Sequence, residues 1–337
     1  MKRTINKPVS RIVMIDPASP STSVVREATR VLRQGGLVAF PTETVYGLGA
    51  RALDPEAVTR IFTAKGRPAN HPLIAHVLGV SDASALAARW SSLADELASR
   101  FWPGPLTLVV ERAVGIPSVI SGGASTVALR APAHPVARAL IAALGEPIAA
   151  PSANRYQSIS PTQASHVASS LGSNVDMILD GGRSLCGIES TVVDLTGERP
   201  RILRHGAIPI GSIRTVVDVE IATGPVASNS SRVSPGMDAR HYAPKTKLVL
   251  VDRRDLIADM CLAEGGSVGV ILCGVADRSF EASRVVELPA DSELYARELF
   301  ATLHDLDARG LKAVIVEAPP NDESWLAVRD RLVRAQA

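Results

Sequence analysis

Basic residues stand close together in one short segment of this 337-residue chain. Lys65 and Arg67 flank Gly66 directly after a predicted helix, so both cations could reach one phosphate or carboxylate. The same two residues would also suit the solvated C-terminal end of a helix, which favours basic side chains. The pair by itself favours neither interpretation.

Three further segments offer hydroxyl and amide groups to a ligand. Ser152 and Asn154 follow an apolar strand, and the end of a buried strand is a common ligand position in α/β sheets. Ser160 precedes a proline at a predicted helix start, where free N–H groups suit a phosphate. Ser190 follows Glu189 and leads into a strand. For each segment taken alone, a turn, a helix cap or a structural carboxylate is the favoured explanation.

Arg130 and Arg204 stand at the ends of two predicted strands. A buried guanidinium needs an anionic partner, which could be a substrate or an internal carboxylate. Together these segments predict a cleft lined by Lys, Arg and hydroxyl groups, with no paired nucleophile and base. Such a cleft suits phosphoryl or nucleotidyl transfer, in which positioning and charge neutralisation carry the catalysis.

A glycine-rich segment and a pair of histidines are weaker candidates for a site. Residues 46–52, YGLGARA, match the dinucleotide-binding fingerprint, but no acidic residue follows about twenty positions later and the next helix begins only at Asp54. His71 and His76 could share a metal ion, although a loop or ligand-contact role is favoured. The chain contains no P-loop, GxSxG or HExxH motif.

Alternating helices and strands must position these residues. Asp54 and Pro55 form a strong helix start, because a capping Asp, a first-turn Pro and an acid occur together. Up to residue 211 we predict one mixed α/β domain with a large core. The predicted helices of this domain are 24–34, 54–64, 134–145 and 160–171, and the first is capped by Ser23 and ended by Gly35. The predicted strands are 37–40, 107–112, 126–132, 176–180, 191–196 and 200–204, and a further buried strand precedes Pro151.

Residues 223–240 are dominated by small, polar, Pro and Gly residues, which is typical of a linker. Beyond them, apolar strand-like runs alternate with helical patterns, which predicts a small, mostly parallel sheet of Rossmann-like type. We therefore predict a catalytic domain over residues 1–211, a linker that is also an active-site lid over 212–244, and a C-terminal domain over 245–337.

Composition restricts the classes of function that remain. Lys and Arg number 36 against 34 Asp and Glu, for a net charge of +2, and the aromatic residues are 5 Phe, 4 Tyr and 3 Trp. Neither count favours polybasic or base-stacking binding of nucleic acid. A local basic patch is still compatible with this net charge and this aromatic content. An RNA-binding module with incidental nucleotide binding is therefore the alternative function.

Three separated cysteines, Cys186, Cys261 and Cys273, argue against a disulfide scaffold or a Cys-rich zinc site. No apolar run reaches the ~18 residues of a membrane span. The basic N-terminus is not followed by an apolar stretch of signal-peptide length. We therefore expect a cytoplasmic protein without a membrane partner.

Seven motifs occur in a fixed order in the first domain: PTETVYGLG, KGRP followed by HPL, WPGPLT, TVALRAP, PSAN followed by SPT, GIESTVVD and ILRHGAI. In this order they resemble the YrdC-like threonylcarbamoyl-AMP synthases. The later segment SPGMDARHYAPK resembles the linker of the longer, two-domain form of that family, whose second domain is Rossmann-like. The resemblance covers essentially the whole chain, and the order of the motifs is its specific signal.

This resemblance implies a YrdC-like twisted mixed sheet with flanking helices, plus a small Rossmann-like parallel α/β C-terminal domain. It implies a nucleotidyltransferase that converts L-threonine, bicarbonate or CO2, and ATP into threonylcarbamoyl-AMP and pyrophosphate, with Mg²⁺ accompanying the ATP. The product would feed the threonylcarbamoyladenosine modification of tRNA through other transfer proteins, and weak RNA binding is compatible with this role. A third class, carbamoyltransferase-like enzymes that use carbamoyl phosphate, is longer and richer in zinc-binding Cys than this chain.

The resemblance also implies roles for individual residues. Lys65 and Arg67 would be catalytic by gripping the ATP phosphates. Threonine would be bound by Thr44, His76, Arg130, Ser190 and the backbone of Ala150. ATP would be bound by Lys65, Arg67, His71, Thr126, Ser152, Asn154, Ser160, Arg204, His241 and Tyr242, the last two closing over it from the linker. No residue is implied as a metal ligand. Position 71 departs from the pattern, which has Ser or Asn where this chain has the bulkier His.

Overall fold

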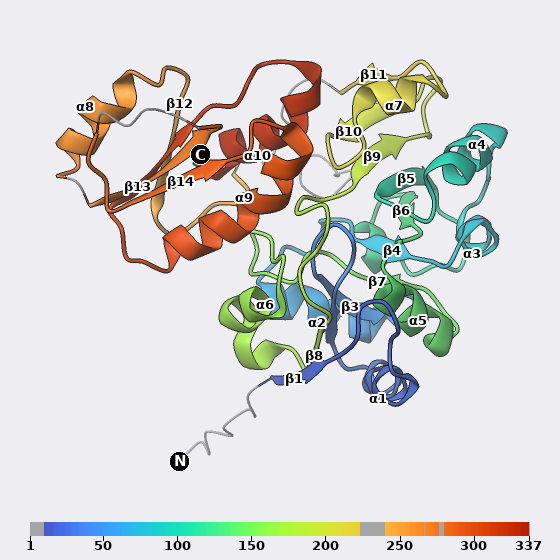
Figure 1. Cartoon of the computed structure of the whole chain (residues 1–337). Coiled ribbons are helices and arrows are strands. Elements are labelled where there is room, and N and C mark those ends of the chain that lie inside the picture. Colours follow the sequence, from blue (N-terminus) through green and yellow to red (C-terminus); the bar gives the residue numbers. More distant parts are fainter. Residues whose placement is uncertain (1–9, 223–239, 266, 276–279, 337) are drawn as a thin grey trace, which may run out of the picture.

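The computed structural model describes residues 10–222, 240–265, 267–275 and 280–336, which form two α/β units (Figure 1). The strands of the first unit are β1 (Arg11–Met14), β2 (Val38–Phe40), β3 (Gly47–Arg51), β4 (Ile74–His76), β5 (Leu106–Glu111), β6 (Thr126–Arg130), β7 (Ile148–Ala149), β8 (Met177–Asp180), β9 (Thr191–Asp194), β10 (Arg201–Arg204) and β11 (Glu220–Ile221). They form one mixed sheet in the order β1-β8-β2-β3-β7-β4-β6-β5-β9-β10-β11. The predicted mixed sheet is confirmed.

Helices cover both faces of this sheet. They are α1 (Thr22–Arg33), α2 (Pro55–Lys65), α3 (Val80–Leu86), α4 (Ser92–Phe101), α5 (Pro135–Leu144), α6 (Ala164–Leu171) and α7 (Ile210–Arg214). Successive residues of a strand point to opposite faces. Val38 and Phe40 therefore pack in one core with α1 and α5, while Leu37 and Ala39 pack in another with α2 and α6. Burial on both faces explains why this segment is continuously apolar.

The second unit has four parallel strands, β12 (Lys247–Val251), β13 (Val268–Cys273), β14 (Arg284–Leu288) and β15 (Ala313–Glu317), in the order β12-β15-β13-β14. Its helices are α8 (Leu256–Ala263), α9 (Ser292–Asp307) and α10 (Leu326–Gln336). The Rossmann-like parallel architecture is confirmed. Sequence analysis missed β14, an edge strand whose residues are only partly buried apart from Leu288. No helix among the described residues is long and apolar enough to cross a membrane.

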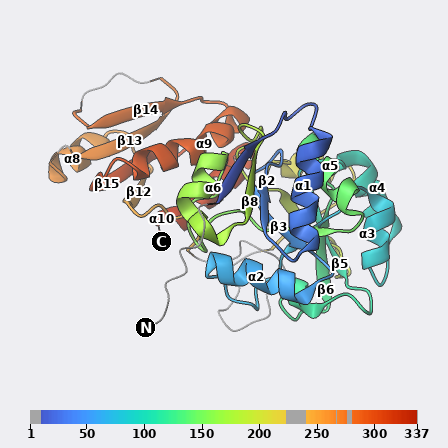
Figure 2. The ribbon, with the colours of Figure 1, turned by 90° about the horizontal axis from the view of Figure 1, so that it is seen from below.

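Helices α9 and α10 of the second unit pack against the first unit (Figure 1). One core cluster joins Val45, Ile188 and Tyr242 to residues of both helices. Helix α9 also lies beside α6 (Figure 2), where the rings of His166 and His304 stack with centroids 3.9 Å apart. The contact surface between the units is therefore formed by segments far apart in the sequence.

Two predicted helix starts are confirmed by their caps. The Asp54 carboxylate accepts hydrogen bonds from the backbone N–H groups of Glu56 and Ala57, both at 3.1 Å, and α2 begins at Pro55. His134 caps α5 through Nδ1, which accepts from the N–H of Val136. In both cases the signal is local, because the cap and its partners lie within three residues.

Two other predicted caps are wrong. Helix α1 begins at Thr22, so Ser23 lies inside the helix rather than capping it. Helix α6 begins at Ala164, four residues after Ser160, and the Ser160 hydroxyl donates to Glu189 instead of capping it. The intervening backbone is used elsewhere, since the carbonyls of Pro161 and Thr162 accept hydrogen bonds from Tyr46 and Ser184.

The glycine fingerprint at residues 46–52 is part of β3, which pairs with β2 and β7, so it forms no phosphate-binding turn. A Cβ at Gly49 would lie 2.6 Å from the Phe40 ring, which explains the glycine. Helix α7 overlaps the start of the predicted linker, and strand β11 lies within the linker and pairs with β10 of the first sheet. The central part of the predicted linker and lid, residues 223–239, lies outside the described residues.

Candidate active site

A cavity of about 50 Å³ lies where several elements of the first sheet end. Strands β4 and β6 are parallel, and their last residues, His76 and Arg130, are register partners at its wall. This is the edge of an open α/β sheet at which ligands commonly bind. The predicted ligand-binding residues that line the cavity are Thr44, Arg67, His76, Arg130, Ser152, Ser190, Arg204, His241 and Tyr242.

Lys65 ends α2 and is only 3% exposed, so it is not the solvated helix end that the sequence left open. Its Nζ donates to the carbonyls of Ser152 and Asn154, each at 2.6 Å. Burial, followed by repulsion from Arg67, holds the pKa of Lys65 well below its usual value. Lys65 therefore anchors the loop after β7 while carrying a charge that burial makes costly.

Arg130 has an internal carboxylate as its partner. The guanidinium Nη2 lies 2.7 Å from Glu43 Oε1, and Nη1 donates to the Thr44 hydroxyl at 2.9 Å. Burial raises the pKa of Glu43, but Arg130 outweighs it and holds the pKa below its usual value. Of the two anions that sequence analysis left open for Arg130, the structure contains the internal one, and Arg130 still lines the cavity.

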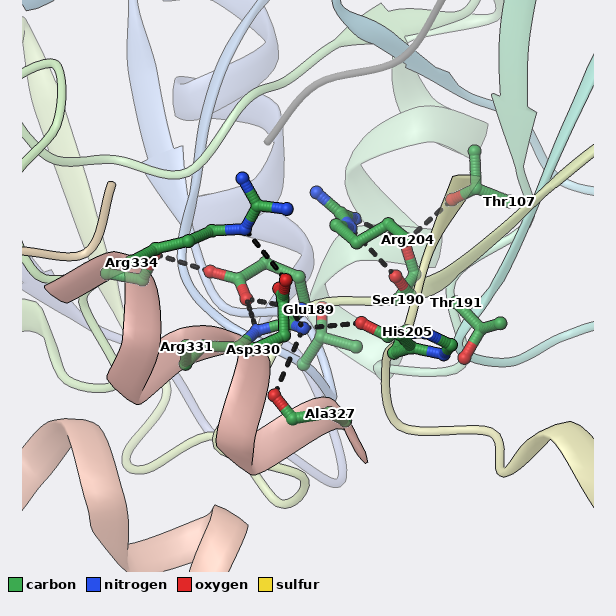
Figure 3. Close-up of polar contacts among 12 residues, drawn as sticks. Thr107, Glu189, Ser190, Thr191, Arg204, His205, Ala327, Asp330, Arg331 and Arg334 are labelled. Carbon is green, nitrogen blue, oxygen red and sulfur yellow. Dashed lines mark hydrogen bonds and ion pairs between the residues drawn. The ribbon is translucent and has the colours of Figure 1, made fainter. Parts of the chain in front are cut away.

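Ser190 and Arg204 form a second polar wall (Figure 3). Arg204 donates from Nε to the Ser190 carbonyl at 3.1 Å and from Nη2 to its hydroxyl at 3.0 Å. The Ser190 hydroxyl also shares a hydrogen bond with Thr107 at 2.7 Å. This arrangement needs a glycine at position 206, because a Cβ there would lie 2.3 Å from the Ser190 carbonyl carbon.

Three aromatic or imidazole side chains complete the cavity. Burial, with the nearby charge of Arg130, lowers the pKa of His76 to about 3, so this ring is neutral. Burial and the surrounding cations also hold the pKa of His241 well below its usual value. Tyr242 is fully buried, with a backbone φ of 60°, and burial raises its pKa to about 12.

Comparison with known proteins agrees with this geometry. A model of the Sua5–YciO–YrdC family, described as telomere recombination, matches residues 30–206, and a model described as the threonylcarbamoyl-AMP synthase C-terminal domain matches residues 208–337. The chain belongs to the threonylcarbamoyl-AMP synthase family. Within it, a Pyrococcus abyssi protein named threonylcarbamoyl-AMP synthase is 45% identical over 92% of this chain and 93% of its own length.

Further relatives cover the full length of both units. A Bacillus subtilis protein with the same name is 37% identical over 95% of each chain. The crystal structure of P. abyssi Sua5 complexed with L-threonine superimposes with a TM-score of 0.90 and 41% identity, over 97% of this chain and 98% of that chain. The similarity therefore includes the second unit and its contact with the first.

Several residues that the family resemblance implies do not line the cavity. Asn154 lies beside it, because its carbonyl binds Lys65. Ala150 is buried in the core with α1 and α5, and its N–H donates to the carbonyl of Ile74, so only its own carbonyl could face a ligand. Ser160 is fully buried and donates to Glu189 at 2.5 Å. It is not at a helix N-terminus, which removes the phosphate site predicted there.

Thr126 and His71 are also absent from the walls of the cavity. Thr126 begins β6, whereas Arg130 ends it, and four residues of strand span about 13 Å. The ring of His71 contacts Tyr156 edge-on, with centroids 5.3 Å apart. The described cavity therefore does not include these two predicted ATP contacts, and a nucleotide would meet them only beyond its present walls.

Sequence analysis missed Glu43 and Arg331, and it treated Glu189, which lines the cavity, as a structural carboxylate without identifying its partner. Glu43 lies within the PTETVYGLG motif, so its position was visible but its pairing with Arg130 was not. Glu189 and Arg331 form a buried ion pair with an N–O distance of 3.0 Å across the two units. The one sequence signal for Arg331 is its place on the apolar face of α10, among Val328, Leu332 and Ala335.

A larger cavity of about 290 Å³ lies between the units. Its walls come from residues 185–210 of the first unit and from the N-terminal ends of α9 and α10, and contain none of the predicted ligand-binding residues. Among the described residues, no three His, Cys, Asp or Glu side chains form a group that could hold a metal ion.

Proposed function

We propose that this enzyme makes threonylcarbamoyl-AMP and pyrophosphate from L-threonine, bicarbonate or CO2, and ATP, for the threonylcarbamoyl modification of tRNA. The observation that carries the proposal is the convergence of Lys65, Arg67, Arg130 and Arg204 beside one buried cavity. Two anionic substrates repel one another, and buried cations are what would hold them together. Relatives that match both units bear the name of this activity.

We place threonine at the carboxyl ends of β4 and β6. Arg130 would bind the threonine carboxylate while Glu43 holds the guanidinium in place, and the Thr44 hydroxyl already accepts from the same guanidinium. Neutral His76 would serve as a hydrogen-bond partner rather than as a cation. Ser190 and the carbonyl of Ala150 would complete this subsite.

We place the ATP phosphates at Lys65, Arg67 and Arg204, with Ser152 and Asn154 beside them. Small-molecule sites usually measure ~300–1,000 Å³, whereas this cavity measures about 50 Å³. ATP can therefore enter only if the walls move. His241 and Tyr242 are the wall residues nearest the end of the linker, so we assign the movement to them. His71 and Thr126 would reach the nucleotide only in that opened state.

Mg²⁺ would enter on the ATP phosphates, because it commonly keeps several waters and bridges a nucleotide's oxygens. Ser152, on the cavity wall, offers a hydroxyl, and Asn154 offers an amide oxygen 3.5 Å from Lys65 Nζ; both are hard donors that would fit this ion. When bound, the ion would neutralise phosphate charge.

The chemistry follows from this arrangement. The threonine amine would add to CO2 and lose a proton, which gives a carbamate. A carbamate oxygen would attack the α-phosphorus of ATP, and the bond from that phosphorus to the bridging oxygen would break as pyrophosphate leaves. A carbamate is already a nucleophile, so no activated Ser or Cys is needed. Cys186 would be unsuited to the task, because burial raises its pKa to about 11.

Burial of the cavity also matters for the products. A carbamate and a mixed anhydride both decay in water, so a site that excludes water would preserve them.

The proposal also includes partners and a location. Downstream proteins would transfer the threonylcarbamoyl group to tRNA, the enzyme would contact RNA weakly, and it would act in the cytoplasm.

The test is pyrophosphate release by the purified protein with ATP, Mg²⁺, bicarbonate and each amino acid in turn. We expect release that depends on both threonine and bicarbonate. Release without either substrate, or no release with all of them, would refute the proposal. Binding of RNA measured against salt concentration would then test the alternative, since a phosphate-backbone binder loses affinity steeply with salt.

A further inference from the structure

Arg331 of the second unit is 1% exposed and contacts three separate segments of the chain, of which Figure 3 shows those of Glu189 and His205. Its Nε and Nη2 donate to Glu189 Oε2 at 3.1 and 3.0 Å. Its Nη1 donates to the carbonyl of His205. The ring centroid of Tyr242 lies 5.3 Å from the guanidinium carbon.

Each contacted segment supplies a wall of the small cavity. Glu189 and Tyr242 line the cavity themselves, and His205 follows Arg204, which also lines it. The same helix makes a further contact with this region, because the N–H of His241 donates to the carbonyl of Arg334 at 3.0 Å. The Glu189 and His205 segments also contact each other within the first unit, through Arg204 and Ser190. Helix α10 thus joins these two segments to the segment of His241 and Tyr242.

The other oxygen of Glu189 is also occupied. Glu189 Oε1 accepts from the Ser160 hydroxyl at 2.5 Å, so each carboxylate oxygen has a partner. Burial works against the charge of Arg331, but Tyr242, Glu189 and Asp330 raise its pKa above the usual value. Arg331 therefore keeps its charge, and both oxygens of Glu189 are hydrogen-bonded in a defined geometry.

A buried ion pair of this kind contributes little net stability, because desolvation offsets the attraction between the charges. The planar guanidinium instead fixes how the two partners are oriented, because its Nε and Nη2 both donate to one carboxylate oxygen. Arg331 does not line the cavity, so it acts on the cavity through its neighbours.

We propose that Arg331 is a positioning residue of the active site, supplied by the second unit, which sets the relative positions of Ser190, Arg204 and Tyr242. The proposal rests on the proposed function, which makes these three residues substrate contacts. It gives the second unit a direct part in the reaction, beyond covering the first.

The test is a double-mutant cycle on the full-length enzyme with Arg331→Met, Glu189→Gln and the double variant. Arg331→Met leaves Glu189 buried without its partner, so we expect a clear loss of stability in urea unfolding. The double variant removes that unpaired charge and should recover stability. The kcat/KM of the double variant for threonine should stay about 100-fold below the wild-type value, because the guanidinium that positions the cavity walls is absent.

Coupling between the two residues is the decisive readout. If they act as one positioning unit, the double variant should lose no more kcat/KM than either single variant. Arg331→Lys keeps the charge without the planar guanidinium and should recover only part of the loss. Wild-type kcat/KM in the double variant, or effects of the two substitutions that simply add, would overturn the proposal.

Two matched arginines serve as controls. Arg329 lies on the same helix but donates to the carbonyl of Pro319, within the second unit. Arg183 pairs with Glu298 of α9 at 2.7 Å across the unit interface, away from the cavity. Met at either position should change kcat/KM less than about twofold, because both arginines are partly exposed and neither they nor their partners line the cavity. If Arg183→Met lowers kcat/KM as much as Arg331→Met does, Arg331 only helps to hold the two units together, and its positioning role is overturned.

The wild-type reaction separates the two proposals. If the wild-type enzyme releases no pyrophosphate with threonine and bicarbonate, the proposed function fails. If the wild type is active and the Arg331 variants behave like the Arg329 control, only the positioning role fails.

Discussion

Lys65 and Arg331 are both buried cations beside the same cavity, one in each unit, and they differ in their partners. Lys65 binds two backbone carbonyls, and among the described residues no carboxylate forms an ion pair with it. Arg331 is paired with Glu189 at 3.0 Å. Burial holds the pKa of Lys65 well below its usual value, whereas the anionic partners of Arg331 raise its pKa. The lysine charge is left for a ligand to balance, and the arginine charge is already balanced by the protein.

Arg130 is intermediate between these two cases. It is paired with Glu43, as Arg331 is paired with Glu189, but it lines the cavity, which Arg331 does not. The roles we propose for the three cations therefore differ. Lys65 would bind the phosphates, Arg130 would bind the threonine carboxylate, and Arg331 would position residues that line the cavity.

The largest expected effect is that of Lys65→Met. We expect kcat for pyrophosphate release to fall about 1,000-fold, because a buried charge that stabilises the transferring phosphate is lost. Stability should also fall, by ~1–3 kcal/mol, because Met keeps the length of the side chain but leaves two carbonyls without a donor. Steady-state rates and urea unfolding measure both quantities. Lys312→Met, which removes an exposed lysine bound to one carbonyl of the second unit, is the control. Near-normal turnover would contradict the role given to Lys65.

The second prediction distinguishes the role of Arg130 in threonine binding from its role in stability. Arg130→Met should lower kcat/KM for threonine about 100-fold and cost ~3–5 kcal/mol of stability, because Glu43 is left buried and unpaired. Adding Glu43→Gln should restore stability and leave activity low. Arg51→Met, at the half-buried pair with Glu146, is the matched control and should leave threonine binding intact. If the double variant regains threonine binding, Arg130 does not contact the substrate.

Proton uptake offers a sharper test of the unbalanced lysine. The pKa of Lys65 is lowered in the folded protein, so a bound phosphate should raise it again. Consider pH values between the lowered pKa of Lys65 and its usual value of about 10.5. In this range the enzyme should take up as much as about one proton when pyrophosphate binds, and its affinity for pyrophosphate should fall as the pH rises. At pH values below the lowered pKa the effect should vanish. Calorimetry in two buffers of different ionisation enthalpy measures the uptake, and Lys65→Met should abolish it. Uptake that is unchanged in that variant would assign the proton to another group.

The smallest effect concerns Ser160, which contacts Glu189 rather than the cavity. Ser160→Ala should cost ~1–3 kcal/mol of stability, because a buried carboxylate oxygen loses its donor. We expect kcat/KM to fall less than about tenfold, through a slight shift of the pair formed by Glu189 and Arg331. Urea unfolding and the ATP dependence of the rate measure these effects. A 100-fold rise in KM for ATP would instead restore the direct nucleotide contact that the sequence predicts.

Local signals in the sequence predicted local structure well. Asp54 and Pro55 start α2 as expected, because the cap and its acceptors lie within one turn. Ser160 and Pro161 carry a similar signal, yet no helix begins there. The Ser160 hydroxyl is taken by Glu189, which lies 29 residues later, and a long-range contact of this kind leaves no trace in the local pattern.

The sequence by itself determined the two-unit α/β architecture, the family, and most of the residues that line the cavity, because ordered motifs and hydrophobic periodicity are local properties of the chain. Only the tertiary structure decided which of these residues meet. It brought Thr44, His76 and Arg130 to one wall and left Thr126 at the far end of its strand. It also paired Arg331 with Glu189, 142 residues away, since the identity of a buried charge's partner is set by packing between units and not by spacing along the chain.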